Sequence, residues 1–429
     1  MKTFKNPPRT QWAELLSRPR QTKETVDTTV SGIFEDVRQN GDTAISRYTT
    51  IFDGVEVKDP RVTAGEIQAA SQALPPSLKA AIKQAKAAIE QFHLAQRSEV
   101  VKVYTAEGVC CWQEKRPIQK VGLYIPGGTA PLFSTVLMLA VPAQLAGCQE
   151  IVLVSPPDRL GKIHPAILYA AGLCGVTTVL AMGGIQAIAG LTFGTSSCPQ
   201  VYKIFGPGNQ FVTAAKQLAT RYGVAIDMPA GPSELLVLAD QTARPDFIAA
   251  DLLSQAEHGA DSQVILLSTA AGISEAVAQE ISSQLQVLPR KEIAAKALEN
   301  SKSIQVKDKE TALELVNVYG PEHLILCTDD NDFYKEGLIN AGSVFIGNYS
   351  PESAGDYASG TNHTLPTNGY SKAYSGVNLD AFLKAISFQE ISEEGILNIG
   401  PAIETMAEAE GLQAHKNAVS IRLKNLQID

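Results

Sequence analysis

From residue 120 onward, short apolar stretches alternate with longer helical ones, and this alternation constrains the fold more than any other feature. KVGLYIP, EIVLVSP, TTVLAMG and VYKIFGPG are typical of strands, and each precedes a segment of helical character such as TAPLFSTVLMLAVPAQLAG. Strands that alternate with helices across short Gly- and Pro-containing links form a parallel sheet covered on both faces. We therefore expect residues 120–235 to form a doubly wound α/β domain.

A second series of alternations begins after Pro232. LLVLAD, QVILLS, SIQVKD, HLILCT and SVFIGN are typical of strands, and helical segments separate most of them. We expect a further α/β domain built from 26–119, which begins with helices, and from 236–376. Residues 1–25 would then be a helical N-terminal arm, and 377–429 a helical C-terminal segment. The expected fold class is α/β with two doubly wound, Rossmann-like domains.

Composition and charge exclude several classes of protein. The net charge of −9 argues against a nucleic-acid partner, because such proteins carry a basic face toward the phosphates. No apolar stretch reaches the roughly 18 residues that a membrane span requires. The six cysteines have no C-x-x-C spacing, which fits a reducing compartment and excludes the usual cysteine-ligated zinc site. We expect a cytoplasmic enzyme that binds neither nucleic acid nor membrane.

Three glycine-containing loops follow strands of the first series. They are Gly127-Gly128, Gly183-Gly184 and Gly206-Pro207-Gly208. Ligands of doubly wound folds bind at the carboxyl ends of the strands, and glycine lets backbone amides approach an anion closely. None of the loops completes the G-x-G-x-x-G pattern, so each alone can also be an ordinary tight turn. Together they favour a cleft for a phosphate-bearing cofactor.

The six histidines divide into two groups. His93 lies among Gln, Lys and Arg on a helix, where a solvated face is the expected role, and His164 precedes Pro165 at a helix start, where a structural role is expected. The other four lie in the second half of the chain, beside turn residues and carboxylates: His258, His323, His363 and His415. This second group is where we look for chemistry.

Two of these histidines have a polar neighbour at short range. Gln255 and His258 are three apart on a helix that ends at Gly259, so they share a face and could ligate a metal. His258 could instead only complement the helix dipole. Glu322 and His323 suit proton transfer, although adjacent residues of a strand point to opposite faces unless the turn twists them.

The other two histidines lie near the C-terminus. The irregular stretch GNYSPESAGDYASGTNHTLPT contains Asp356 and His363, and a loop of this length in a compact domain favours a functional role. Glu410 and His415 would face different directions on a continuous helix, but Gly411 between them predicts a break that leaves both free to face one site. A solvated surface helix is the alternative.

Taken together, YIPGGTAPLFSTVLMLAVPAQLAG, KIFGPGNQFVTAAK, DMPAGPSE, LLSQAEHG, YGPEHL, SAGDYASGTNHTLPT and AHKNAV resemble the histidinol dehydrogenase family. The resemblance extends from about residue 20 to 425 and follows the order of the family's motifs. It implies an aldehyde-dehydrogenase-like arrangement of the domains. It also implies oxidation of L-histidinol through L-histidinal to L-histidine, with reduction of two NAD⁺, in the last steps of histidine biosynthesis.

The resemblance also implies a role for particular residues, without a departure from the family at any of them. One Zn²⁺ per subunit would be held by Gln255, His258, Asp356 and, from the other subunit of a homodimer, the partner's His415. Glu322 and His323 would handle protons. Substrate contacts would come from Ser233, His363 and Glu410 together with the zinc ligands and His323, and NAD contacts from Tyr124, Gln186 and Asn209. The C-terminal segment would mediate dimerisation.

Three alternatives remain at the level of the sequence. A related zinc dehydrogenase could act on another amino alcohol or a polyol, but His363 and Glu410 favour a substrate that carries an imidazole and an ammonium group. A zinc hydrolase could use Glu322 to activate water, but it would have no use for the glycine-rich loops of the first series. A binding module without catalysis would leave the Asp356–His363 loop unexplained.

Overall fold

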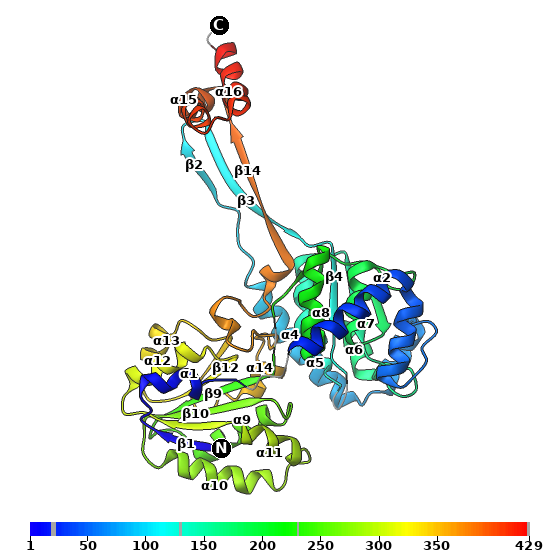
Figure 1. Ribbon diagram of the computed structural model, residues 1–429, viewed down its shortest axis with the longest axis vertical. Coiled ribbons are helices and arrows are strands. Elements are labelled where there is room, and N and C mark those ends of the chain that lie inside the picture. The colour runs from blue at the N-terminus through cyan, green and yellow to red at the C-terminus, as the bar shows by residue number, and fades with distance from the viewer. Residues whose placement is uncertain (19–22, 128–130, 230, 427–429) are drawn as a thin grey trace. The chain divides into compact units, whose positions relative to one another are not determined.

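The computed structural model describes residues 1–18, 23–127, 131–229 and 231–426. Within this part the chain divides into two compact units, each made of separate stretches. The larger unit contains Met1–Ala95 and Ile118–Phe382, and the smaller contains Gln96–Pro117 and Leu383–Asp429. Each unit is described by itself below (Figure 1).

The first predicted series of strands forms a parallel sheet in the larger unit, which we call the β4 sheet. Its strand order is β6-β5-β4-β7-β8, with every neighbouring pair parallel. The strands are β4 (Lys120–Tyr124), β5 (Glu150–Ser155), β6 (Thr178–Ala181), β7 (Lys203–Phe205) and β8 (Ala225–Ile226), and the helices between them are α5 (Phe133–Ala146), α6 (Pro165–Leu173), α7 (Gly184–Phe193) and α8 (Gln210–Ala219). The alternation predicted over 120–235 is thus confirmed.

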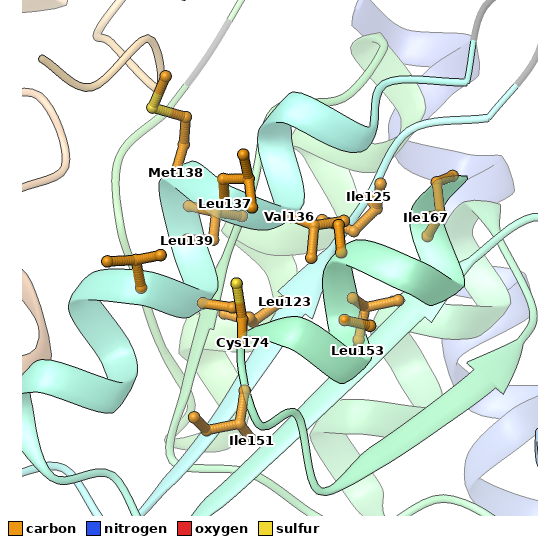
Figure 2. Packing of buried hydrophobic residues seen from close by; sticks show 14 of the residues in the cluster. Leu123, Ile125, Val136, Leu137, Met138, Leu139, Ile151, Leu153, Ile167 and Cys174 are labelled. Atoms are coloured by element: carbon orange, nitrogen blue, oxygen red, sulfur yellow. The ribbon is translucent and has the colours of Figure 1, made fainter. Parts of the chain in front are cut away.

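Helices cover both faces of the β4 sheet. On one face, α5 and α6 pack with Leu123 and Leu153 of the strands, as Figure 2 shows. The N-terminal helices α3 (Ala64–Ala73) and α4 (Pro76–Leu94) join this face, and α2 (Lys23–Asp53) packs on the other face with α7 and α8.

The position of α2, α3 and α4 differs from the expected division of the chain, which placed 26–119 with 236–376. The apolar stripe of α2, which includes Val30, Phe34 and Val37, is buried in one cluster with Val152 and Val154 of the β4 sheet. Burial of such a stripe is what fixes an amphipathic helix, and the sequence does not say which of two apolar sheets it will cover.

The second predicted series forms another parallel sheet, the β9 sheet, in the order β1-β11-β10-β9-β12-β13. Figure 1 shows α9, α10 and α11 on one side of it and α1, α12 and α13 on the other, in agreement with the two clusters of buried side chains. The strands are β9 (Glu234–Ala239), β10 (Gln263–Ser268), β11 (Lys302–Gln305), β12 (His323–Cys327) and β13 (Ser343–Ile346), and the helices are α1 (Trp12–Leu15), α9 (Pro245–Ala256), α10 (Ile273–Leu285), α11 (Lys291–Glu299), α12 (Lys309–Tyr319), α13 (Asn331–Gly337) and α14 (Glu352–Tyr357). The predicted strands are confirmed.

The expected N-terminal arm contributes a strand to this sheet. β1 (Lys2–Lys5) pairs in parallel with β11, and Trp12, Leu15 and Leu16 are buried against the sheet. An edge strand of four mostly polar residues is held by backbone pairing, so it has no apolar alternation from which it could be predicted.

The smaller unit consists of an antiparallel sheet in the order β14-β3-β2, followed by two helices (Figure 1). Its elements are β2 (Lys102–Ala106), β3 (Val109–Pro117), β14 (Leu383–Ile391), α15 (Glu393–Ala409) and α16 (Gln413–Leu426). The segment 377–429, expected to be helical, therefore contains a strand, β14, before its two α-helices. The predicted break at Gly411 is confirmed, because this residue has a φ of +72° between α15 and α16.

The remaining short elements are the 3-10 helices η1 (Arg9–Gln11), η2 (Thr220–Tyr222), η3 (Tyr370–Lys372) and η4 (Leu379–Phe382). In the described ranges, every helix is too short or too polar to span a bilayer.

The two histidines expected to lie outside the chemistry have different environments. His164 is the N-cap of α6, where its Nδ1 accepts a hydrogen bond from the Ala166 backbone at 3.2 Å, so the expected structural role is confirmed. His93 was expected on a solvated face but is fully buried, with Nδ1 2.8 Å from the Ile89 carbonyl and Nε2 3.3 Å from the Asn362 amide. Partners distant in the sequence, such as Asn362, make this burial possible.

Candidate active site

Glu322 and His323 are held together by the backbone of one residue, Glu234 at the start of β9. A Glu322 carboxylate oxygen accepts a hydrogen bond from the Glu234 N–H at 2.8 Å, and His323 Nδ1 lies 3.2 Å from the Glu234 carbonyl. The two side chains approach to 3.8 Å, although neighbours in a strand would point apart. The reason is that β12 begins only at His323, so Glu322 still lies in the preceding turn.

The hydrogen bond to a carbonyl fixes the tautomer of His323. A carbonyl oxygen only accepts, so Nδ1 carries the proton and a neutral ring presents a lone pair at Nε2. Nε2 is buried and has no hydrogen-bond partner among the described residues. Burial lowers the pKa of His323 to about 4, so the ring is neutral near pH 7 and Nε2 is available as a base.

Glu322 has the opposite shift. Burial raises the pKa of the Glu322 carboxyl well above its usual value, and the neighbouring carboxylates of Glu234 and Asp356 act in the same direction. The hydrogen bond from the Glu234 N–H opposes this shift. A carboxyl in such surroundings takes up and releases a proton at a higher pH than an exposed one, which suits it to proton transfer.

The loop that follows β13 brings two further carboxylates to His323. Glu352 and Asp356 lie one turn apart on α14, with Glu352 Oε1 3.6 Å from His323 Nδ1 and Asp356 Oδ1 4.0 Å from His323 Nε2. His363 follows in the same loop, with Nδ1 3.0 Å from the Asp356 carbonyl and Nε2 3.2 Å from the Thr135 hydroxyl of α5. Burial lowers the pKa of His363.

The end of helix α9 and the turn that follows it supply the next pair, Gln255 and His258. Gln255 is buried, and neither atom of its amide has a partner among the described residues. The exposed His258 donates from Nδ1 to the Ser254 carbonyl at 2.9 Å, which leaves Nε2 as a free acceptor. His258 also lowers the pKa of both His323 and His363, so its ring lies near them. One turn before Gln255, burial raises the pKa of Asp251 to about 7.

These residues fit a metal ion. A buried polar atom without a partner costs free energy, and here the Gln255 amide, His323 Nε2 and Glu352 Oε2 are all in that condition within the described part of the chain. The donors are nitrogen and oxygen atoms, which Zn²⁺ accepts in sites that keep an open position. One group whose ligand atoms lie within 4.8 Å of one another is His323, Glu352 and Asp356. Asp356 belongs both to this group and to the ligands implied by the sequence.

The residues expected to contact NAD lie at the carboxyl ends of strands in the β4 sheet. Tyr124 ends β4, and its hydroxyl accepts a hydrogen bond from the Gly184 N–H at 3.3 Å. Gln186, in the first turn of α7, is buried with an unpartnered amide, as far as the described residues extend. Asn209 caps α8 by accepting from the Phe211 and Val212 N–H groups at 3.0 and 3.1 Å.

At one position in these glycine loops, close packing explains why the residue is glycine. Gly206 has a φ of +125°, and a Cβ there would lie 2.1 Å from the Tyr124 carbonyl oxygen. Only glycine allows the loop after β7 to pack this closely on the end of β4. Of the other predicted loops, Gly128 lies outside the described residues.

Known proteins resemble this chain over its full length. A family model described as histidinol dehydrogenase matches residues 16–423. A histidinol dehydrogenase of Bacteroides thetaiotaomicron is 60% identical with 100% of each chain covered, and one of Yersinia pestis is 54% identical with 97% and 94% covered. A crystal structure of histidinol dehydrogenase from Elizabethkingia anophelis has a TM-score of 0.97 at 55% identity, covering 100% and 99%.

The chain belongs to the histidinol dehydrogenase family. It is therefore an enzyme of the oxidoreductase class, as the resemblance of its motifs implied. An acetylating aldehyde dehydrogenase from Geobacillus thermoglucosidasius has a TM-score of 0.50 at 15% identity over 88% of this chain and 93% of that one, a likeness of fold alone. The α/β class with an aldehyde-dehydrogenase-like arrangement is thus confirmed.

The structure groups only some of the expected site residues of this histidinol dehydrogenase family member. Around His323 it brings together Glu322, Asp356 and His363, with Gln255 at the end of α9 and His258 just beyond that helix. Ser233 immediately precedes Glu234. Glu410, at the C-cap of α15, and His415, in α16, are exposed and belong to the smaller unit.

Several residues beside Glu322 and His323 were not predicted from the sequence. Glu352 could have been found, because it lies four residues before Asp356 and thus on the same face of a helix. Asp251 stands in the same relation to Gln255. Arg18 and Glu234 gave no such indication, because only the fold brings them together.

Proposed function

We propose that this chain is a zinc-dependent, NAD-linked enzyme that oxidises L-histidinol through L-histidinal to L-histidine in the last steps of histidine biosynthesis. One observation carries the proposal: among the described residues, the Gln255 amide and His323 Nε2 are buried without a hydrogen-bond partner. In a chain of this family, such groups suit metal binding and proton transfer. The overall reaction is L-histidinol + 2 NAD⁺ + H₂O → L-histidine + 2 NADH + 3 H⁺.

The zinc ligands in this proposal are Gln255, His258, Asp356 and the partner subunit's His415. His258 Nε2, which can accept, and the Gln255 amide, which has no partner among the residues that the structure describes, support the first two assignments. When bound, Zn²⁺ would supply Lewis acidity and orient the nitrogen atoms of the substrate.

In the first oxidation, His323 accepts the proton of the substrate's hydroxyl group at Nε2 while hydride leaves the carbinol carbon for NAD⁺. The neutral ring fixed by the Glu234 carbonyl supports this role. Ser233, His363 and Glu410 would hold the substrate, with Glu410 pairing with its ammonium group or imidazole N–H. Tyr124, Gln186 and Asn209 would hold NAD at the ends of the β4 strands.

In the second oxidation, water adds to the aldehyde to give a hydrate. Glu322 accepts a proton from that water as its oxygen bonds to the carbonyl carbon, while His323 returns to the former carbonyl oxygen the proton that it gained in the first oxidation. The raised pKa of Glu322 supports its base role. His323 then accepts a hydroxyl proton of the hydrate while a second hydride leaves for a second NAD⁺. The product is the carboxylic acid, which ionises.

We further propose a homodimer whose active sites each use residues of both subunits. The smaller unit supports this, because large apolar side chains are exposed on it, including Val101 at 70%, Tyr104 at 74% and Met406 at 65%. A groove of about 680 Å³ on its sheet is lined in part by Val101, Trp112 and Phe388. Exposed apolar surface of this kind marks a protein interface.

The deciding experiment combines a metal assay of the purified protein with the stoichiometry of the reaction. We expect about one zinc per subunit and two NADH for each L-histidine formed. Failure of metal-replete protein to form NADH from L-histidinol would refute the proposal, and one NADH with release of the aldehyde would refute the second step. Faster turnover of another amino alcohol or a polyol would favour the related dehydrogenase instead.

A further inference from the structure

We propose that Arg18 is a positioning residue for the catalytic pair and acts through the side chain of Glu234. The inference rests on the proposed function of Glu322 and His323. It concerns the part of the molecule that holds these two residues in place, which lies at the N-terminal side of β9 and β12.

Arg18 contacts the two chain segments from which the catalytic pair is built. Its guanidinium group donates to both carboxylate oxygens of Glu234, at 2.5 and 2.9 Å. It also donates to the carbonyls of Tyr319 and Gly320, at 2.9 and 3.3 Å, and lies 4.1 Å from the centre of the Tyr319 ring. Gly320 is separated from Glu322 only by Pro321, so Arg18 fixes the turn from which Glu322 and His323 project.

Glu234 connects Arg18 to the catalytic pair. Its N–H donates to Glu322, and its carbonyl accepts from His323. The two peptide groups that flank the Glu234 Cα therefore each hold one of the catalytic side chains. Its carboxylate, besides binding Arg18, accepts a hydrogen bond from the Asn368 N–H at 2.7 Å. A rotation of the Glu234 backbone would therefore move both catalytic groups at once.

Stability alone does not account for this ion pair. The Arg18 and Glu234 side chains are only 14% and 3% exposed, and at such burial the desolvation of two charges offsets much of their attraction. Trp12, Leu15 and Leu16 already anchor the N-terminal segment by packing on the β9 sheet. What the ion pair adds is a bidentate, directional contact that fixes the orientation of Glu234.

The inference predicts a specific kinetic signature. Loss of Arg18 should displace the catalytic pair without removing any group that binds substrate or metal, so kcat should fall while KM and metal content stay close to wild type. A misplacement of about 1 Å can cost about 10²-fold in rate. The fall in kcat for Arg18→Met should be of that order.

The experiment compares Arg18→Met, Arg18→Lys, Glu234→Gln and the double variant R18M/E234Q with wild type, using L-histidinol and NAD⁺. Arg18→Lys keeps the charge but loses the two-bond fork, so it should recover part of the kcat lost in Arg18→Met. The double variant should lose no more kcat than R18M alone, because both substitutions remove one interaction. Arg9→Met is the matched control, since Arg9 pairs with Glu314 from the same segment but is 74% exposed.

The possible results separate the two proposals. An inactive wild type refutes the proposed function. With an active wild type, an R18M kcat within twofold of wild type overturns the positioning role, as does a rise in KM with kcat unchanged or an equal loss in R9M. If R18M does not fold, R18K and E234Q decide, because wild-type kcat in both would also overturn it.

Discussion

At the scale of single residues, the site depends on which polar atoms are buried without a partner. The sequence placed Gln255, His258, Glu322, His323 and Asp356 in one functional group by resemblance, and the structure brings their side chains to neighbouring elements. Spacing alone could not do this, because each pair had an ordinary structural explanation. Tautomers and shifted pKa values depend on burial, so the lone pair at His323 Nε2 and the raised pKa of the Glu352 carboxyl could not be predicted from the sequence.

His258→Asn distinguishes the two groups of residues that could hold the metal. If Gln255, His258 and Asp356 are the ligands, this variant should bind zinc weakly, by about 10²-fold or more, whereas Glu352→Gln should keep it. Metal content measured after gel filtration against a chelator checks the prediction. Full zinc in His258→Asn and loss in Glu352→Gln would favour His323, Glu352 and Asp356. His164→Asn, a change at a helix cap, is the control.

Glu322→Gln tests the separate roles proposed for Glu322 and His323. The amide oxygen can still accept the hydrogen bond from the Glu234 N–H, so the geometry should persist while the base is lost. We expect oxidation of L-histidinal to slow by about 10²-fold or more, and oxidation of L-histidinol to slow much less. Single-turnover measurements from each substrate provide the comparison within one protein. Equal slowing of both oxidations would contradict a role specific to water.

At the scale of elements, one buried ion pair fixes a loop of the β4 sheet. Lys216 of α8 donates to an Asp227 carboxylate oxygen at 2.5 Å and to the Gly206 carbonyl at 2.7 Å, while Asp227 accepts from the Gly206 N–H at 2.7 Å. The two side chains are 3% and 1% exposed. Both polar groups of Gly206 are thus held, and the loop leads directly to Asn209.

Asp227→Asn should destabilise the protein by about 3–5 kcal/mol, because it leaves the charge of Lys216 buried without its partner. The double variant Lys216→Met with Asp227→Asn removes both charges and should regain most of that stability, yet bind NAD more weakly because the Gly206 loop is freed. Urea unfolding and NAD titration provide the two measurements. Asp332→Asn, at an exposed ion pair, should change neither. Unchanged NAD affinity in the double variant would refute the link between this loop and the cofactor.

The elements also show where sequence patterns stop being informative. Every strand predicted after residue 120 was confirmed, because buried parallel strands are continuous apolar runs. β2, β3 and β14 were not predicted, since they are largely exposed and β3 pairs with a strand far away in the sequence. The pairing of a strand with a partner far away in the sequence cannot be predicted from the residues of that strand alone.

At the scale of the whole molecule, the proposed dimer places one ligand of each site on the other subunit. Two variants that each form L-histidine slowly should then complement each other in the rate of L-histidine formation. In a mixed dimer of Glu322→Gln and His415→Ala, one of the two sites takes Glu322 from the His415→Ala chain and His415 from the Glu322→Gln chain. This site is complete, whereas the other lacks both residues. Random pairing should restore about a quarter of the wild-type rate. Co-expression with two affinity tags isolates the mixed dimer, and an inactive one would contradict the shared site.

The smaller unit has a consequence for biosynthesis. Its sheet joins Gln113 of β3 to Ser387 of β14, a separation of 274 residues. At ~5–20 residues per second, a ribosome needs roughly a quarter of a minute to a minute to deliver the second strand after the first. The nascent hairpin of β2 and β3 therefore waits with an open edge, while the β4 and β9 sheets between them can already fold. The proposed assembly of two chains through this unit can begin only after β14 has been synthesised, so chaperones that shield strand edges should act on this hairpin.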